Sequence, residues 1–176
     1  MTTTLARTGA AIAAAGLLIG MLSACTPETK SPPKPTTSAA FATDEEAFAA
    51  AEETYRAYVK AGNLPDGNED KYLAGMALEN HLEGERRLED AGLHVEGETA
   101  LSSFEVKPES VARDRTSLTA AVCLDLRRLR TISADGANVT PADRPDAIAM
   151  TVEMQLSAGK FLIFEELDAD NALCAS

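Results

Sequence analysis

The chain has 176 residues, of which 45% are apolar and 25% charged, with 16 basic against 28 acidic side chains. This length suits one ordinary domain, and the apolar content excludes wholesale disorder. The formal net charge of −12 argues against a nucleic-acid surface, which needs clustered Lys and Arg side chains, and against adsorption to anionic lipid by charge.

Residues 1–24 are typical of a secretory signal peptide. Arg7 is their one charged side chain, and the apolar run over 10–21 is too short to cross a bilayer as a helix. The tetrapeptide LSAC over 22–25 resembles the lipobox of bacterial lipoproteins. That resemblance implies cleavage before Cys25 and acylation of its thiol, with palmitate as a typical chain. The alternative is an ordinary signal peptide that is cleaved after an alanine.

Residues 25–40 are predicted to form a tether. The segment is rich in Pro, Thr and Ser, so it cannot bury a core and favours extended geometry. At ~3.1 Å per residue it reaches roughly 45 Å. The expected organisation is a signal peptide over 1–24, a lipidated tether over 25–40 and one domain over 41–176. The domain is expected at the extracytoplasmic face of the cell membrane, in the cell envelope.

The domain begins with a predicted helix over 44–61. Thr43 and Glu46 have the spacing of a capping box, and Gly62 is the stop signal. The apolar residues that follow recur at helical spacing: Phe48, Ala51, Tyr55, Tyr58 and Val59.

A second helical region extends to Gly92. Its apolar residues predict a short helix that breaks near Gly75 and a longer helix that ends at 91–92. These residues are Tyr72, Leu73 and Met76 in the first part and Leu78, Leu82 and Leu88 in the second.

Beyond Gly92 the apolar period changes from helical to alternating, which predicts strands. The expected strands span 94–106, 116–129, 147–156 and 161–167. A loop is expected over 133–145, and a hairpin turn over 157–160. Helices followed by about four antiparallel strands indicate an α+β fold, with the helices packed on one face of a curved sheet.

Cys123 and Cys174 are predicted to form a disulfide, because an even pair of cysteines in an exported domain is usually oxidised. The bridge would stabilise the domain by about 4 kcal/mol in the chain-entropy model. Free buried thiols and a catalytic cysteine are the alternatives.

The order of elements resembles the nuclear-transport-factor-2-like superfamily, also called the ketosteroid-isomerase-like or SnoaL-like cone. The lipobox, the tether and the Tyr-x-x-Tyr pair at Tyr55 and Tyr58 are similar to those of small actinobacterial lipoproteins of this fold. The resemblance implies a cavity that often binds an apolar ligand. In enzymes of the superfamily that cavity holds a carboxylate with a Tyr or His.

Three residues are candidates for such a cavity: Tyr55, Tyr58 and Asp125. A buried Asp125 near a tyrosine would be an acid/base pair. The simpler interpretation makes the tyrosines core residues and Asp125 a solvent-facing partner of Arg127, on the same strand face.

No metal site is expected. His81 and Glu85 lie one helical turn apart, but zinc sites need three or four ligands. Asp66, Asn68 and Asp70 alternate as in a calcium loop, which lacks its Gly and its final Glu here. The acids near the C-terminus are expected at a solvated edge, or against a basic partner: Glu165, Glu166, Asp168 and Asp170.

The expected function is binding without catalysis, of a small apolar ligand or of another envelope protein, with no cofactor and no nucleic-acid partner. The rival hypothesis is an isomerase or hydrolase that uses Asp125 with Tyr55 and Tyr58. A purely structural envelope role is a third hypothesis.

Overall fold

A computed structural model describes residues 40–65 and 67–175 of the chain. The predicted signal peptide, Cys25 and nearly all of the tether lie outside these residues. Among the helices described, none has the length and apolar content needed to cross a membrane.

The first helix, α1 (Asp44–Gly62), confirms the predicted start and nearly the predicted end. Thr43 Oγ1 accepts a hydrogen bond from the backbone N–H of Glu46 at 3.2 Å. The Glu46 carboxylate accepts in turn from the N–H of Ala42 at 2.9 Å. The helix includes Gly62 and is capped by Asn63.

The second helical region is broken as predicted, into a 3-10 turn, η1 (Glu69–Tyr72), and a helix, α2 (Gly75–Asp90). Between them the chain is extended, and the N–H of Ala74 donates to the carbonyl of Ile163 at 2.8 Å. The expected apolar stripe is only partly correct. Met76 and Leu82 are 54% and 43% exposed, because the buried face of α2 is formed by Ala77, with Leu78 packed beside it.

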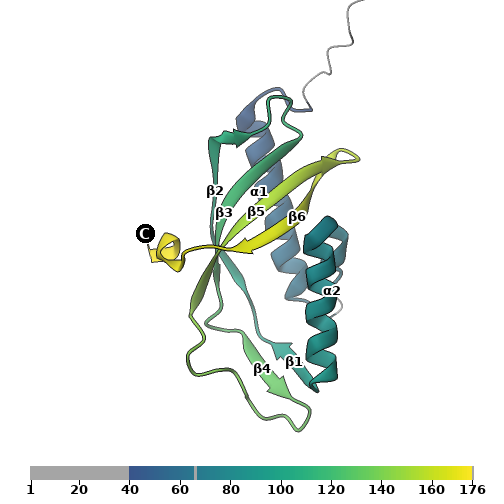
Figure 1. Ribbon diagram of the computed structural model, residues 1–176, viewed down its shortest axis with the longest axis vertical. Coiled ribbons are helices and arrows are strands. Elements are labelled where there is room, and N and C mark those ends of the chain that lie inside the picture. The colour runs from purple at the N-terminus through teal and green to yellow at the C-terminus, as the bar shows by residue number, and fades with distance from the viewer. Residues whose placement is uncertain (1–39, 66, 176) are drawn as a thin grey trace, which may run out of the picture. The chain divides into compact units, whose positions relative to one another are not determined.

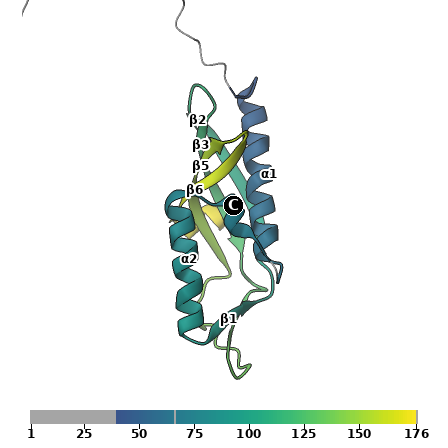
Figure 2. The same ribbon diagram turned by 90° about the vertical axis from the view of Figure 1, so that its right-hand side faces the viewer.

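Four antiparallel strands form the main sheet in the order β2-β3-β5-β6. Their bounds are β2 (Ala100–Val111), β3 (Ser117–Asp125), β5 (Ala147–Ser157) and β6 (Lys160–Asp168). The sheet is curved, and α1 and α2 cover one of its faces (Figures 1 and 2). The predicted α+β fold is confirmed.

The strand expected over 94–106 is two strands. Its first part, β1 (Leu93–Glu96), leaves the main sheet and pairs with β4 (Arg130–Ser133). The break occurs at Gly97, whose φ is +101° and where a Cβ would lie 2.0 Å from the carbonyl oxygen of Arg128. The strand expected over 116–129 likewise ends at Asp125, and β4 was not predicted.

The core lies between the helices and the sheet. Its fully buried side chains include Tyr55 from α1, and the alternating inward residues of the strands complete it. These are Leu118, Ala120 and Val122 on β3, Val152 and Met154 on β5, and Phe161 and Ile163 on β6.

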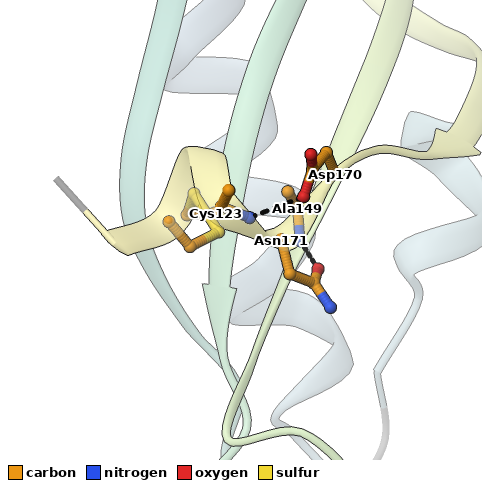
Figure 3. Close-up of a disulfide and its surroundings, with 6 residues drawn as sticks. Cys123, Ala149, Asp170 and Asn171 are labelled. Atoms are coloured by element: carbon orange, nitrogen blue, oxygen red, sulfur yellow. Dashed lines mark hydrogen bonds between the residues drawn. A yellow bond between two sulfur atoms is a disulfide. The ribbon is translucent and has the colours of Figure 1, made fainter.

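The predicted disulfide between Cys123 and Cys174 is confirmed, with its Cα atoms 5.5 Å apart. Cys123 is on the sheet face opposite the helices, and Cys174 lies in a short terminal turn, η2 (Asn171–Ala175) (Figures 1 and 3). Asn171 Oδ1 accepts a hydrogen bond from the N–H of Ala149 at 2.8 Å, so side chain and disulfide together hold the turn against the sheet.

Candidate functional site

A β-bulge in β6 decides which acidic side chain enters the domain. Ile163 pairs with Met154 and Glu165 pairs with Glu153, so Phe164 has no partner on β5. An unpaired residue reverses the alternation of all side chains beyond it.

The reversal turns Glu166 toward the helices. Phe161 and Ile163 face the core, so regular alternation would continue with Glu165 and Leu167. Glu166 instead lies opposite Val152, a core residue, and Leu167 is left 51% exposed. The expectation that Glu166 lies at a solvated edge is therefore wrong, whereas Asp168 is exposed as expected.

Two tyrosines of α1 hold the Glu166 carboxylate. The hydroxyl of Tyr55 donates to Oε1 at 2.8 Å, and the hydroxyl of Tyr58 donates to Oε2 at 3.3 Å. The i,i+3 spacing of the tyrosines brings both hydroxyls to one carboxylate. Their rings meet edge to face with centroids 5.6 Å apart, and Tyr55 is fully buried.

Burial dominates the electrostatics of this cluster. It raises the pKa of Glu166, while the hydrogen bonds from the two tyrosines and the nearby His81 act in the opposite direction. Burial, reinforced by the Glu166 carboxylate, raises the pKa of Tyr55 and of Tyr58. Both phenols are therefore protonated donors at neutral pH, beside a carboxyl group with an increased proton affinity.

A pocket of about 350 Å³ opens beside Tyr58. Its apolar lining comes from α1, β1, the end of β3, β5 and the segment after β3: Val59, Val95, Leu124, Leu126, Leu129 and Ile148. Its polar lining includes Tyr58, Glu69 and His81. Asn63 also lines it, but both polar atoms of its side chain are bound to the backbone of Thr99 at 2.8 Å.

Glu69, His81 and Glu85 form a second polar cluster at the edge of this pocket. Their ligand atoms all lie within 4.8 Å of one another. Among the described residues, this is the group of side chains that could hold a metal ion. The sequence pairs only His81 with Glu85; Glu69 joins them through the position of η1.

The structure separates Asp125 from the two tyrosines. Leu124 and Leu126 line the pocket, so alternation along β3 directs Asp125 to the opposite face. There it forms an ion pair with Arg127, whose hydrogen bonds lower the pKa of Asp125 to about 2. The candidate cavity set of Tyr55, Tyr58 and Asp125 is thus corrected: Glu166 takes the place of Asp125, and Tyr55 belongs to the core.

No family profile and no curated protein matches the sequence. Among solved structures, the intermembrane-space region of the chloroplast protein ARC6 aligns with a TM-score of 0.49 at 16% identity, over 69% of this chain and 95% of that one. Aln2 from a Streptomyces species aligns with a TM-score of 0.47 at 12% identity, over 76% and 97%. A proposed polyketide cyclase from Xanthomonas campestris aligns with a TM-score of 0.39 at 14% identity, over 73% and 96%. Likenesses this distant say nothing of activity.

Proposed function

We propose that this chain is a lipoprotein anchored through Cys25 at the extracytoplasmic face of the cell membrane, and that its cone-like domain binds a small, largely apolar molecule without catalysis. The observation that carries the proposal is the pocket beside Tyr58. Its volume of about 350 Å³ lies within the ~300–1,000 Å³ range of small-molecule sites.

The lining indicates the chemistry of the ligand. Six aliphatic side chains offer an apolar wall, and the Tyr58 hydroxyl and the His81 imidazole can orient one polar group. Glu69 lines the pocket, and the Glu166 carboxylate accepts a hydrogen bond from Tyr58. The two carboxylates would repel an anionic ligand. A neutral molecule with a hydroxyl or carbonyl group fits best.

Nile red, a neutral apolar dye, tests the pocket in the Cys25→Ala chain without its signal peptide, residues 25–176, which needs no detergent because it lacks both the apolar leader and the acylation site. We expect saturable binding that Leu124→Arg weakens by more than about tenfold, since the change places a charge in the apolar wall. Leu167→Arg is the matched control on the exposed side of β6. Equal binding by both variants, or no saturable binding, would contradict the proposal.

Native mass spectrometry of the protein from its own host then identifies the ligand as a co-purifying mass. A clean apo protein that also fails to bind Nile red would favour an envelope-protein partner instead.

The anchor has a separate test. Cys25→Ala is expected to move the protein from the membrane fraction to the medium, because the acyl chains supply the membrane affinity. Retention in membranes of a variant whose mass shows that residues 1–24 have been removed would contradict lipid anchoring and leave the pocket proposal untouched.

The half-buried Glu166 favours catalysis as a second candidate function. A carboxyl group with a raised pKa next to two phenol donors can exchange a proton with a bound substrate through Tyr58. If the domain is an enzyme, Glu166→Gln should trap a substrate that differs from the species bound to the wild type, in mass for a hydrolase or in chromatographic retention and fragmentation for an isomerase. The same species, by mass, retention and fragmentation, in both proteins would exclude this role for Glu166.

A further inference from the structure

Glu69, His81 and Glu85 come together from two elements of the fold. Their ligand atoms, one imidazole nitrogen and two carboxylate oxygens, all lie within 4.8 Å of one another. We propose that these three side chains bind a first-row divalent transition-metal cation, with Zn²⁺ as the representative ion.

The backbone preorganises the cluster. His81 and Glu85 are one turn apart on α2, and His81 Nε2 lies 3.7 Å from Glu85 Oε1. Glu69 is the first residue of η1, and the chain just after η1 is held to β6 by the hydrogen bond from Ala74 to Ile163.

The distances between the three side chains suit shared coordination of a metal ion better than direct hydrogen bonds between them. At 3.7 Å the imidazole and Glu85 are too far apart for a hydrogen bond. Ligands at ~2.0–2.2 Å from a tetrahedral ion lie about 3.4 Å apart, so small rotations of two flexible Glu side chains close the site.

The charges of the three side chains also favour a bound cation. Two carboxylates face one imidazole, and in the part of the chain that the structure describes neither Glu69 nor Glu85 forms an ion pair with a Lys or Arg. A divalent cation at the centre would relieve the repulsion between the two carboxylates.

The position of the cluster leaves the ion accessible. Glu69 and His81 line the pocket beside Tyr58 and also a second pocket of about 590 Å³, to which Glu85 contributes. Three protein ligands with the remaining positions open to water define a site that can take an exogenous ligand, in contrast to closed structural zinc sites. An imidazole ligand favours Zn²⁺ over Mg²⁺ and Ca²⁺, which prefer oxygen.

Calorimetric titration of Zn²⁺ into the metal-free Cys25→Ala chain tests the site. We expect one Zn²⁺ per chain, an affinity at least about tenfold lower in His81→Ala and in Glu69→Gln, and no displacement by Mg²⁺. Co²⁺ should give visible absorption bands that His81→Ala abolishes.

His94→Ala is the control: His94, the other histidine of the chain, also lines the 590 Å³ pocket, but its Nε2 lies 3.2 Å from Glu96 Oε1 and it is not one of the three residues whose ligand atoms come together. Equal losses in His81→Ala and His94→Ala, or no saturable Zn²⁺ binding by the parent chain, would overturn the proposal. If His81→Ala fails to fold, Glu85→Gln replaces it, since that side chain is 59% exposed. Leu167→Arg, which adds the same charge on the exposed side of β6, should still bind Zn²⁺.

Discussion

At the scale of single residues, Glu166 is the least expected feature of the domain. Glu166 is half-buried at the border of the core, where an acidic side chain is unfavourable unless hydrogen bonds compensate for lost hydration. Here the hydroxyls of Tyr55 and Tyr58 donate to its two oxygens. The tyrosines are therefore more than packing residues, because their hydroxyls replace water as donors to a half-buried carboxylate.

Glu166→Gln is expected to stabilise the protein at neutral pH. Burial raises the pKa of Glu166 in the folded state. Its contribution to stability is then fully present below the unfolded pKa of about 4.3 and is lost as the pH rises through the folded value. Gln keeps an acceptor for a tyrosine and removes the charge.

Urea unfolding from pH 4 to pH 8 measures this effect as the difference between variant and wild type. The difference should grow in favour of Glu166→Gln as the pH rises. Asp168→Asn, which neutralises an exposed carboxylate at the end of β6, is the control. A variant that is less stable than wild type at pH 7 would contradict the burial argument.

Tyr55→Phe is expected to lower the free energy of unfolding by about 1–3 kcal/mol, because it leaves the half-buried Glu166 carboxylate with one donor fewer. Tyr58→Phe should cost less, since its hydrogen bond is 3.3 Å against 2.8 Å for Tyr55. Thermal unfolding of both variants checks the order. The reverse order would mean that Tyr58 is the main donor to Glu166.

At the scale of elements, two irregularities shape the site. The bulge at Phe164 turns Glu166 inward, and the break at Gly97 frees β1 to leave the sheet and pair with β4. β1 then supplies Val95 to the pocket beside Tyr58.

Gly97→Ala is expected to destabilise the domain by about 1–3 kcal/mol, because its positive φ and the nearby carbonyl of Arg128 leave no room for a Cβ. Gly84→Ala is the opposite control: it lies in α2 with nothing within 4 Å of an added Cβ. It should stabilise by up to about 1 kcal/mol through helix propensity. Chemical denaturation measures the change in the free energy of unfolding for both variants. No change in Gly97→Ala would show that the break between β1 and β2 tolerates a side chain.

At the scale of the whole domain, the candidate pocket and the disulfide lie on opposite faces of one sheet. The pocket and Glu166 are on the face covered by α1 and α2, while the disulfide lies on the other face (Figures 1 and 3). The disulfide joins residues 51 positions apart and holds the end of the chain to the central strand β3.

Cys174→Ser is expected to lower the free energy of unfolding by up to about 4 kcal/mol, because the unfolded chain gains the freedom of an open loop. Nile red binding by the folded variant should be unchanged, since the pocket is on the other face. Denaturation with and without reductant measures the first effect. Equal unfolding midpoints would contradict it, and a loss of dye binding would mean that the two faces are coupled.

The sequence by itself determined the features that depend on local pattern and covalent chemistry. Thr43 and Glu46 located the start of α1, Gly75 marked the break before α2, and alternation identified four strands of an antiparallel sheet. Cys123 and Cys174 were predicted to form a disulfide because they are the two cysteines of a domain expected to be exported to an oxidising compartment. Each of these signals lies within one segment or needs only two residues.

Which residues come together at the candidate site was decided only by the tertiary structure. Regular alternation predicts Glu165 inward, whereas the bulge on β6 places Glu166 there. The closeness of Arg128 to Gly97, the separation of Asp125 from the tyrosines and the approach of Glu69 to His81 are likewise contacts between distant segments. A single sequence carries no local signal for such contacts, because their geometry depends on the register and packing of neighbouring elements.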